Sequence, residues 1–303
     1  MRLSRFSREA KPNRDGEIKA VRISESDINL LKIIARYPYL NREWLSALSG
    51  LNPDYLRRRL RELKNEPNYY IKIHDTQAKQ RSLYLYSPLN YELDRKGRDE
   101  LAKLGLKIPE KQTRIFDHQV MVSEVMASFE LGLSDGKALH LWEDMGIEAG
   151  KYPFTFEIDY LYRGRPYKNN LSPDGRPFCI EIDKGDSIQS FYFIGFEADC
   201  GTEPIEFHSP KRSSIERKFC EYAALAEERL YHARFGFPHV YVPFIFKSAQ
   251  RMQNAIDLLS RLDLKPRAKR IFLFRVHDDK PNGKMLTEPH KRYSKDGIED
   301  FTF

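Results

Sequence analysis

Two short acidic groupings in the second half of the chain contain the residue types that bind divalent cations. Asp174 lies in the tight turn Pro173-Asp174-Gly175, which enters a β-rich segment. Glu197 and Asp199 flank one alanine in a strand-like run, and the alternation of a strand directs both side chains to the same face. Carboxylates from two neighbouring strand ends, about 4.8 Å apart, can share one Mg²⁺ or Mn²⁺ ion. Asp174, Glu197 and Asp199 are therefore candidate ligands of a divalent cation of the kind that assists phosphodiester cleavage, although carboxylates at strand ends are frequent and usually only solvated.

Several residues near these acids have both a chemical and a structural interpretation. Lys218, on the next predicted helix, could stabilise phosphate charge or form a salt bridge with the acids. Asp174 could instead bind the amides of its own turn. Glu181 and Asp183 form a second acidic pair, which is the alternative site if the strand register differs. His118, at a predicted helix start, is more often a cap or core residue than a base.

The segments around these acids alternate in type. A helix is predicted over residues 116–131, and the order after it is three strands, helix, strand, helix and strand. That order is typical of a mixed sheet with helices packed on it, so we predict an α/β domain over residues 111–303. The strand segments are FTFEIDYLYR, RPFCIEI, SFYFIGFEAD, VYVPFIF and RIFLFRV, and the helices between them are expected at about 214–235 and 249–262.

Three short helices are predicted between residues 24 and 64. Each follows a residue that can cap a helix N-terminus, namely Ser24, Asn41 or Asn52, and each has apolar residues at helical spacing. The leucines of the third helix leave one face free for DNA contact, although a merely solvated charged face is the competing interpretation. The residues expected on this face are Tyr55, Arg57, Arg58, Arg61 and Lys64.

Two β-rich runs follow, at residues 69–73 and 82–86, and they flank a polar, basic turn. Three helices and a hairpin are the order of a winged helix, in which the third helix reads the major groove and the wing contacts phosphates. We therefore predict a winged-helix DNA-binding domain over residues 24–110, with Lys79 and Arg81 on the wing. A basic tail, residues 1–23, precedes it.

The bulk composition agrees with a polyanionic partner. The 303 residues include 51 Lys and Arg against 44 Asp and Glu, a net charge of +7. The three cysteines lack zinc-site spacing and suggest neither a Cys-based zinc site nor a disulfide framework, which favours a reducing, cytoplasmic setting. No apolar run approaches the roughly 20 residues of a membrane span, and the first residues contain no apolar core, so neither membrane insertion nor export is expected.

The motifs resemble those of two known groups of proteins. Pro173-Asp174, Glu197-x-Asp199 and a lysine on the next helix resemble the PD-(D/E)xK restriction-endonuclease superfamily. That superfamily has lysine where this chain has Asp199, so Lys218 is the candidate for its role. Nearly the whole chain is similar to the replication-relaxation family of plasmids and mobile elements. The matching features are the predicted winged helix, Tyr86 to Gly97, Phe116-Asp117-His118, Pro173-Asp174, the run from Phe196 to Pro204, Lys218 and Tyr222.

The resemblance implies duplex DNA as a partner, at an origin or operator, and a restriction-endonuclease-like second domain. In relaxase relatives it also implies a metal-assisted nick by a nucleophile that is normally tyrosine, and the residue types do not single out one of the 17 tyrosines. We therefore expect a metal-dependent DNA nickase of a mobile element. The alternative is a non-catalytic replication initiator or transcription regulator, favoured by the missing lysine. A third interpretation is a module that recruits replication or transfer proteins and needs no metal.

Overall fold

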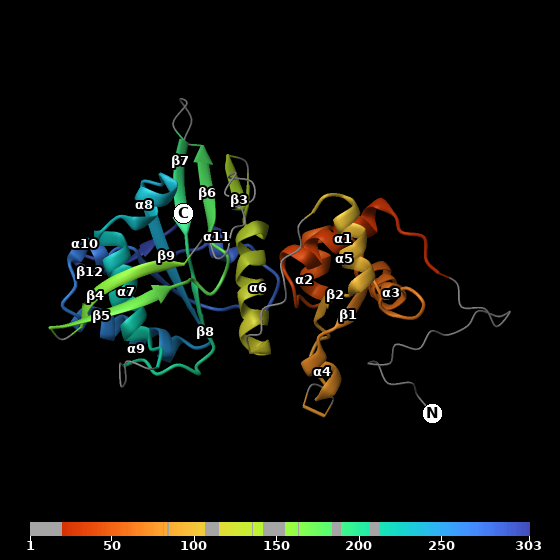
Figure 1. The fold of residues 1–303 in the computed structure, drawn as a ribbon, viewed down its shortest axis with the longest axis horizontal. Coiled ribbons are helices and arrows are strands. Elements are labelled where there is room, and N and C mark those ends of the chain that lie inside the picture. The colour runs from red at the N-terminus through yellow and green to blue at the C-terminus, as the bar shows by residue number, and fades with distance from the viewer. Residues whose placement is uncertain are drawn as a thin grey trace. The chain divides into compact units, whose positions relative to one another are not determined.

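The computed structural model describes the chain in two compact units (Figure 1). Unit 1 consists of Met1–Ala127 and Asp279–Asn282, and unit 2 of Ser128–Asp278 and Gly283–Phe303. Helices and a mixed sheet confirm the predicted α/β class. The described residues are 20–80, 82–83, 85–106, 115–134, 136–141, 155–162, 164–183, 189–206 and 212–303. The predicted tail up to residue 19 and the predicted domain boundary near residue 110 lie outside them.

Three helices open unit 1, and each begins directly after the residue predicted to cap it. They are α1 (Glu25–Arg36), α2 (Arg42–Ser49) and α3 (Pro53–Lys64). Ser24 accepts a hydrogen bond from the backbone of Asp27, whose carboxylate accepts one in return from the backbone of Ser24. Asn41 and Asn52 each accept hydrogen bonds from two backbone N–H groups of the helix that follows. These bonds satisfy donors that a helix N-terminus would otherwise leave without partners.

The two-stranded sheet of unit 1 differs from the predicted hairpin. Its elements, in chain order, are β1 (Ile71–Ile73), α4 (Asp75–Lys79), β2 (Tyr91–Leu93) and the closing helix α5 (Arg95–Lys103), and β1 pairs antiparallel with β2. The predicted strand over residues 82–86 is wrong, because the described residues of that run form no strand. Tyr91 and Leu93 bury their side chains, whereas Leu83 and Leu85 have the same alternation and are exposed.

The predicted face of α3 is exposed except at its C-terminal end. Lys64 was expected on this face but is only 6% exposed. It follows Leu56 and Leu60 by eight and four residues, which is the spacing of the stripe that faces the core. Arg81, the other predicted contact of the wing, lies outside the described residues. The other residues predicted to contact DNA are exposed or partly buried, namely Tyr55, Arg57, Arg58 and Arg61 on α3 and Lys79 at the end of α4.

A buried ion pair joins α3 to α1. The guanidinium of Arg59 donates to both carboxylate oxygens of Asp27, each at 2.6 Å, and it also bonds Glu62. Burial by itself would raise the pKa of Asp27, but the hydrogen bonds from Arg59 and Ser24 lower it below its ordinary value. Asp27 therefore caps α1 and anchors α3 at the same time.

The large sheet of unit 2 is mixed. Its order is β12-β11-β10-β9-β7-β6-β3, and β8 also pairs with β9. The pairs β7–β9, β8–β9 and β9–β10 are parallel, whereas β3, β6 and β7 form an antiparallel set and so do β10, β11 and β12. The strands are β3 (Lys137–Leu141), β6 (Phe178–Asp183), β7 (Gln189–Ile194), β8 (Glu197–Asp199), β9 (His239–Phe246), β10 (Phe272–Val276), β11 (His290–Ser294) and β12 (Gly297–Phe301).

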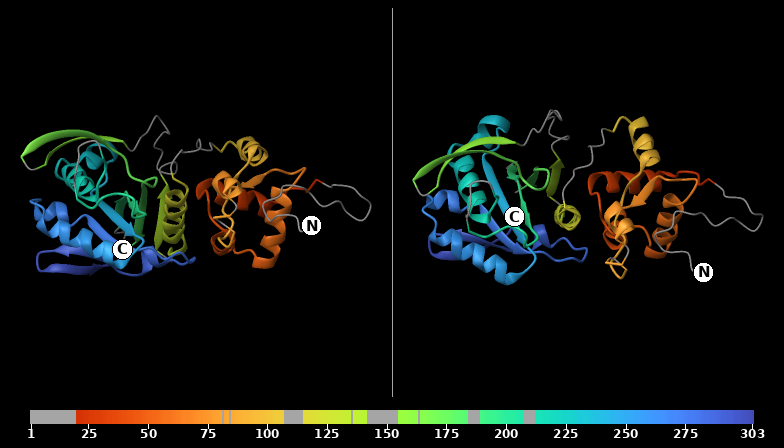
Figure 2. Two further views of the ribbon diagram at one scale, coloured as in Figure 1. Left: turned by 90° about the horizontal axis from the view of Figure 1, so that it is seen from below. Right: turned by 60° about the horizontal axis from the view of Figure 1, so that its bottom comes forward.

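A separate hairpin packs on helix α7 of unit 2 (Figure 2). It consists of β4 (Phe156–Tyr162) and β5 (Arg165–Leu171), so the first predicted strand pairs outside the large sheet.

The predicted helix 214–235 is divided at Arg229, which has a positive φ of 54°. The helices are α7 (Ile215–Glu227), α8 (Leu230–Phe235), α9 (Ala249–Arg261), α10 (Pro266–Lys269) and α11 (Lys284–Thr287), and α6 (Phe116–Leu131) spans the division between the units.

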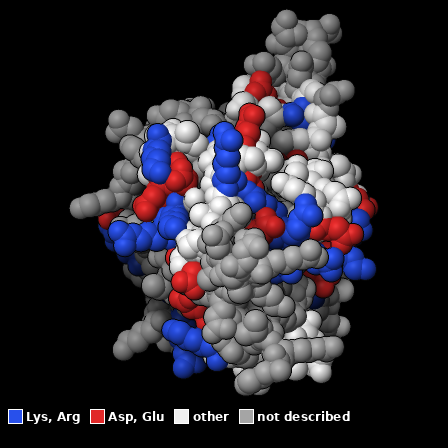
Figure 3. Space-filling view, turned by 90° about the vertical axis from the view of Figure 1, so that its right-hand side faces the viewer, with Lys and Arg blue, Asp and Glu red and all other residues white. Residues whose placement is uncertain are grey.

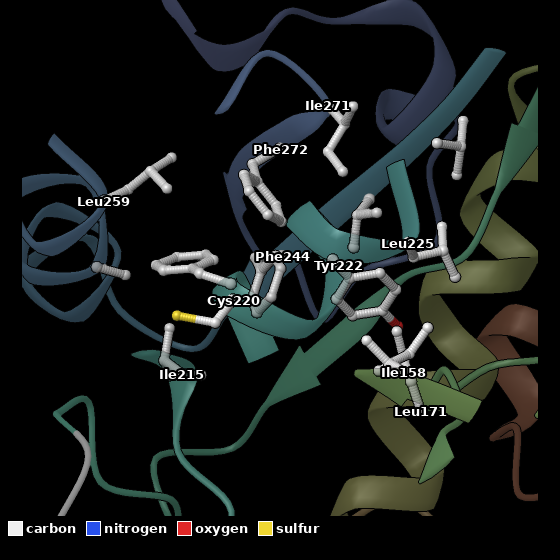
Figure 4. Close-up of a cluster of buried hydrophobic side chains, with 14 of the residues drawn as sticks. Ile158, Leu171, Ile215, Cys220, Tyr222, Leu225, Phe244, Leu259, Ile271 and Phe272 are labelled. Carbon is white, nitrogen blue, oxygen red and sulfur yellow. The ribbon is translucent and has the colours of Figure 1, made fainter. Parts of the chain in front are cut away.

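Aromatic side chains join α7 to the sheet in the core of unit 2 (Figure 4). The ring of Phe219 lies 4.9 Å, between centroids, from the rings of both Phe244 and Phe272. Burying each ring contributes about 1.5 to 3 kcal/mol, which fixes α7 against β9 and β10. None of the helices in the described ranges combines the length and the apolar character that a membrane span requires.

Replacing Arg59 with leucine tests the ion pair between α3 and α1. The substitution leaves the Asp27 carboxylate buried without its partner, and we expect the free energy of unfolding to fall by about 3 to 5 kcal/mol in urea titrations. The matched control is Arg57→Leu on the same helix, because Arg57 pairs with the exposed Asp54 and its loss should cost no more than about 1 kcal/mol. Equal effects of the two substitutions would contradict the proposed importance of the pair.

Candidate functional site

The turn that contains Asp174 is attached to the start of β8. The backbone N–H of Asp174 donates to the carbonyl of Phe196 at 3.2 Å, and the N–H of Ala198 donates to the Asp174 carboxylate at 3.0 Å. Gly175 allows this approach, because a Cβ atom at that position would lie 2.1 Å from the ring of Phe196. The sequence Pro-Asp-Gly thus holds the carboxylate of Asp174 beside Glu197.

Helix α7 supplies a partner for each oxygen of the Glu197 carboxylate. Lys218 and Tyr222 are four residues apart and therefore lie on one face of the helix. The Nζ atom of Lys218 lies 2.8 Å from Oε2 of Glu197, and the hydroxyl of Tyr222 donates to Oε1. Glu197 is only 2% exposed, and the ring of Tyr222 lies in the core cluster shown in Figure 4. The carboxylate is therefore held in one orientation.

A third carboxylate reaches the same ammonium group. Glu203, in the loop after β8, places Oε2 at 3.0 Å from Nζ of Lys218, and Asp174 places Oδ2 at 3.8 Å. Both Glu197 Oε2 and Glu203 Oε2 are buried and contact Lys218 as ion pairs without the geometry of a directed hydrogen bond. We refer to Asp174, Glu197, Glu203, Lys218 and Tyr222 as the Lys218 cluster.

The Lys218 cluster contains three carboxyl groups and one amino group, and the pKa values of Glu197, Lys218 and Tyr222 are all raised. Burial raises the pKa of Glu197 well above its ordinary value, Asp174 raises it further, and Lys218 opposes the shift. Burial would lower the pKa of Lys218, but Glu197, Asp174 and Glu203 together raise it above its ordinary value. Burial and the neighbouring Glu197 also raise the pKa of Tyr222. The cluster therefore favours uptake of a proton or of a second cation.

Asp199 does not join the Lys218 cluster. It is buried, and the guanidinium of Arg251 on α9 binds both of its carboxylate oxygens. The same guanidinium donates to the backbone carbonyl of Glu203, so this pair holds the loop that presents Glu203 to Lys218. The expected pairing of Glu197 with Asp199 around one ion is therefore not what the geometry provides, because each acid has its own cationic partner.

The structure brings Asp174, Glu197 and Lys218 together, and it adds Glu203 and Arg251, which the sequence did not indicate. Arg251 lies 52 positions after Asp199, and the sequence near neither residue indicates that the two side chains pair. Glu203 was visible only as part of the Glu-x-Asp-x-Gly-Thr-Glu-Pro run. In the described ranges, no group of three or more His, Cys, Asp or Glu side chains is arranged to hold a metal ion. Two expected ligands, Asp174 and Glu197, thus remain as candidates.

The alternative acidic pair is only partly described. Glu181 lies on β6 and its carboxylate is 2.6 Å from Nε2 of His140 on β3, at a partly exposed position. The side chain of Asp183 lies outside what the structure describes. His118 lies on α6 within unit 1 and is partly buried.

The raised pKa of Glu197 predicts how stability depends on pH. A carboxyl whose pKa is raised by folding contributes stability below its ordinary value of 4.5, and this contribution is lost as the pH rises through the folded-state pKa. We therefore expect Glu197→Gln, in which Lys218 keeps Glu203, to gain stability relative to the wild type as the pH rises above 4.5. Thermal melts across acidic to neutral pH measure this difference. Glu181→Gln is the control, and parallel curves for the wild type and Glu197→Gln would contradict the assignment.

Comparison with known proteins gives one match. The sequence model of the replication-relaxation family matches residues 31–240, which include all five residues of the Lys218 cluster but not Arg251. No curated protein and no solved structure matches the chain. Because the matched residues make up more than half of the 303, the chain belongs to the replication-relaxation family.

Proposed function

We propose that this protein binds duplex DNA and nicks it with the help of a divalent cation during the replication or relaxation of a mobile element. Membership of the replication-relaxation family supports the general role. The observation that carries the nicking proposal is the convergence of Asp174 and Glu197 on the ammonium of Lys218. In this proposal Lys218 performs from α7 the role of the lysine that PD-(D/E)xK nucleases have at the position of Asp199.

Asp174 and Glu197 would hold Mg²⁺ or Mn²⁺, because carboxylate oxygens are the donors these ions prefer and the repulsion between the two acids would be relieved. When bound, such an ion supplies charge stabilisation and a hydroxide. Asp199 is set apart from these two acids, because its carboxylate pairs with Arg251 and does not reach Lys218. Lys218 would contact a non-bridging phosphate oxygen and stabilise the charge that develops there. Tyr222, which is buried, would keep Glu197 oriented.

Unit 1 would supply the DNA-binding surface. Three helices, a two-stranded sheet and exposed arginines on the third helix support a winged-helix interpretation. On the face drawn in Figure 3, Lys and Arg side chains of the described residues are intermixed with Asp and Glu. Such a surface favours binding through selected contacts of Arg57, Arg58, Arg61 and Lys79 over attraction by one large basic patch.

Replacing Arg57, Arg58 and Arg61 together with alanine in the full-length chain tests the role of α3. We expect weaker binding to duplex DNA and a salt dependence whose slope decreases by about 0.9 for each phosphate that the variant no longer neutralises. The matched control replaces three exposed basic residues of unit 2, Lys265, Arg267 and Arg270, and removes the same charge. If both triple variants show the same reduction in affinity and slope, net charge explains binding and α3 has no special role.

Thermal melts with Mn²⁺ test the proposed cation site. Binding at a hundredfold excess over Kd should stabilise the wild type by about 2.7 kcal/mol. Glu197→Gln should remove most of this gain, whereas the control Glu181→Gln should keep it. Lys218→Met should abolish nicking of supercoiled DNA but leave the Mn²⁺ shift, and Lys218→Arg should partly restore nicking. Because loss of Lys218 leaves buried acids without their partner, its melting temperature is measured alongside.

A second candidate function is a non-catalytic replication initiator or transcription regulator built on a degenerate nuclease fold. It is favoured by the ion pair between Arg251 and Asp199. Asp199 stands at the position where the superfamily has its lysine, and Arg251 already binds it. It predicts that Mn²⁺ changes the melting temperature of neither the wild type nor the variants and that no nick forms. DNA binding by unit 1 would be unaffected.

A further inference from the structure

The ammonium of Lys218 already lies among the acids that the proposed function assigns to a divalent cation. Its Nζ atom lies 2.8 Å from Glu197 Oε2, 3.0 Å from Glu203 Oε2 and 3.8 Å from Asp174 Oδ2. These are distances between an ammonium and carboxylates, whereas Mg²⁺ requires its oxygen ligands at about 2.0 to 2.1 Å. In agreement, no three acid side chains among the described residues are arranged to hold a metal ion. The acids are thus arranged around a cation that belongs to the chain itself.

A divalent cation would need oxygen atoms that the Lys218 cluster already uses. Oε1 of Glu197 accepts a hydrogen bond from the hydroxyl of Tyr222, and Oε2 contacts Lys218. Oδ2 of Asp174 accepts a hydrogen bond from the backbone N–H of Ala198 and faces Lys218. An ion bound to both acids would lie close to the ammonium, and two positive charges repel strongly where little water screens them. One of the existing partners of these oxygens must therefore give way.

Lys218 is the partner that can leave. Tyr222 is 2% exposed and its ring packs in the core cluster, while the N–H of Ala198 belongs to the backbone of β8. The side chain of Lys218 is 14% exposed, and its flexible four-carbon chain lets the ammonium turn outward without movement of α7. Release of the phenol or of the strand would disturb the fold, whereas release of the ammonium changes only side-chain torsions.

We propose that Lys218 is a resident counter-ion that a divalent cation displaces from Glu197 and Asp174, and that a DNA phosphate then receives the released ammonium. This inference rests on the proposed function, which assigns the cation to these two acids and Lys218 to a phosphate. The protein alone binds the cation weakly, because the ammonium must first leave its acids. Bound duplex offers the ammonium another anion, so DNA and the cation strengthen each other's binding, as the reciprocity of coupled sites requires. The site is therefore completed only when both are present.

Chemical labelling of Lys218 in the full-length chain, without DNA, tests the displacement. An amine-reactive acetyl ester is added with and without saturating Mn²⁺, and the labelled peptides are quantified by mass spectrometry. We expect the labelling rate of Lys218 to rise roughly tenfold with Mn²⁺, because the released amine is exposed and the acids no longer hold it protonated. Lys269, a buried lysine whose Nζ donates to the carbonyl of Ser260, is the reference in the same digest and should keep its rate. Glu197→Gln, which loses one ligand, should abolish the increase.

The affinity for a short duplex, measured with and without Mn²⁺, tests the coupling. Mn²⁺ should raise the affinity of the wild type several-fold more than that of Lys218→Gln, which has no ammonium to exchange. The matched control is Lys269→Gln, which removes another buried lysine of unit 2 and should keep the coupling of the wild type. If Lys218→Gln does not fold, as its melting curve would show, the labelling of the wild type still decides.

The outcomes separate this inference from the proposed function. If Mn²⁺ raises the melting temperature of the wild type but Lys218 is labelled no faster, the ion joins the ammonium, so the displacement is wrong and the cation site stands. Equal coupling in the wild type and Lys218→Gln also overturns the displacement. If Mn²⁺ accelerates the labelling of Lys269 as much as that of Lys218, the ion loosens the fold and the displacement is again wrong. If Mn²⁺ changes neither the melting temperature nor the labelling, the cation site and the displacement both fail.

Discussion

The arrangement of the acidic residues in the Lys218 cluster depends on one buried positive charge, the ammonium of Lys218. Three carboxylates approach it, from the turn before β6, from β8 and from the loop after β8. Charges of one sign gathered in a buried space are destabilising unless a cation compensates them. A single helix residue therefore links three separate backbone segments. Other contacts help to place their acids, because backbone hydrogen bonds attach the Asp174 turn to β8 and Arg251 binds the loop that contains Glu203.

The position of Lys218 depends in turn on how α7 is held, with the aromatic core on one side and polar contacts to the β4–β5 hairpin on another. The hydroxyl of Tyr162 on β4 donates to Glu216 at 2.7 Å, and the side chain of Asn169 on β5 donates to Glu221 at 2.7 Å. Each of these two buried acids of α7 is thus satisfied by a hydrogen bond, as burial of a charged group requires. The hairpin contributes to the site although it supplies none of the five cluster residues.

The sequence was most informative where a single segment determines the result. Caps such as Ser24 act on the next few residues, and the turn around Asp174 must approach β8 closely, so both could be read locally. The strand predicted at residues 82–86 was wrong because alternation of apolar residues does not say whether a partner strand is available. Lys64 was misplaced because a long side chain can lie in the core stripe of a helix. The partner of Asp199 could not be predicted, since Arg251 reaches it only after the chain has folded.

Unit 1 is assembled from two stretches of sequence that are far apart. Its short second stretch, Asp279–Asn282, follows most of unit 2 along the chain, and the carbonyl of Asp279 accepts a hydrogen bond at 3.3 Å from the indole of Trp44. Trp44 is fully buried, whereas Asp279 is exposed, so the second stretch supplies from the surface the partner of a buried indole. During synthesis the N-terminal helices leave the ribosome long before residue 279. Unit 1 therefore reaches its complete form only after nearly all of unit 2 has been translated, and a protein cut at the end of its first helices and sheet would leave the indole N–H of Trp44 without this acceptor.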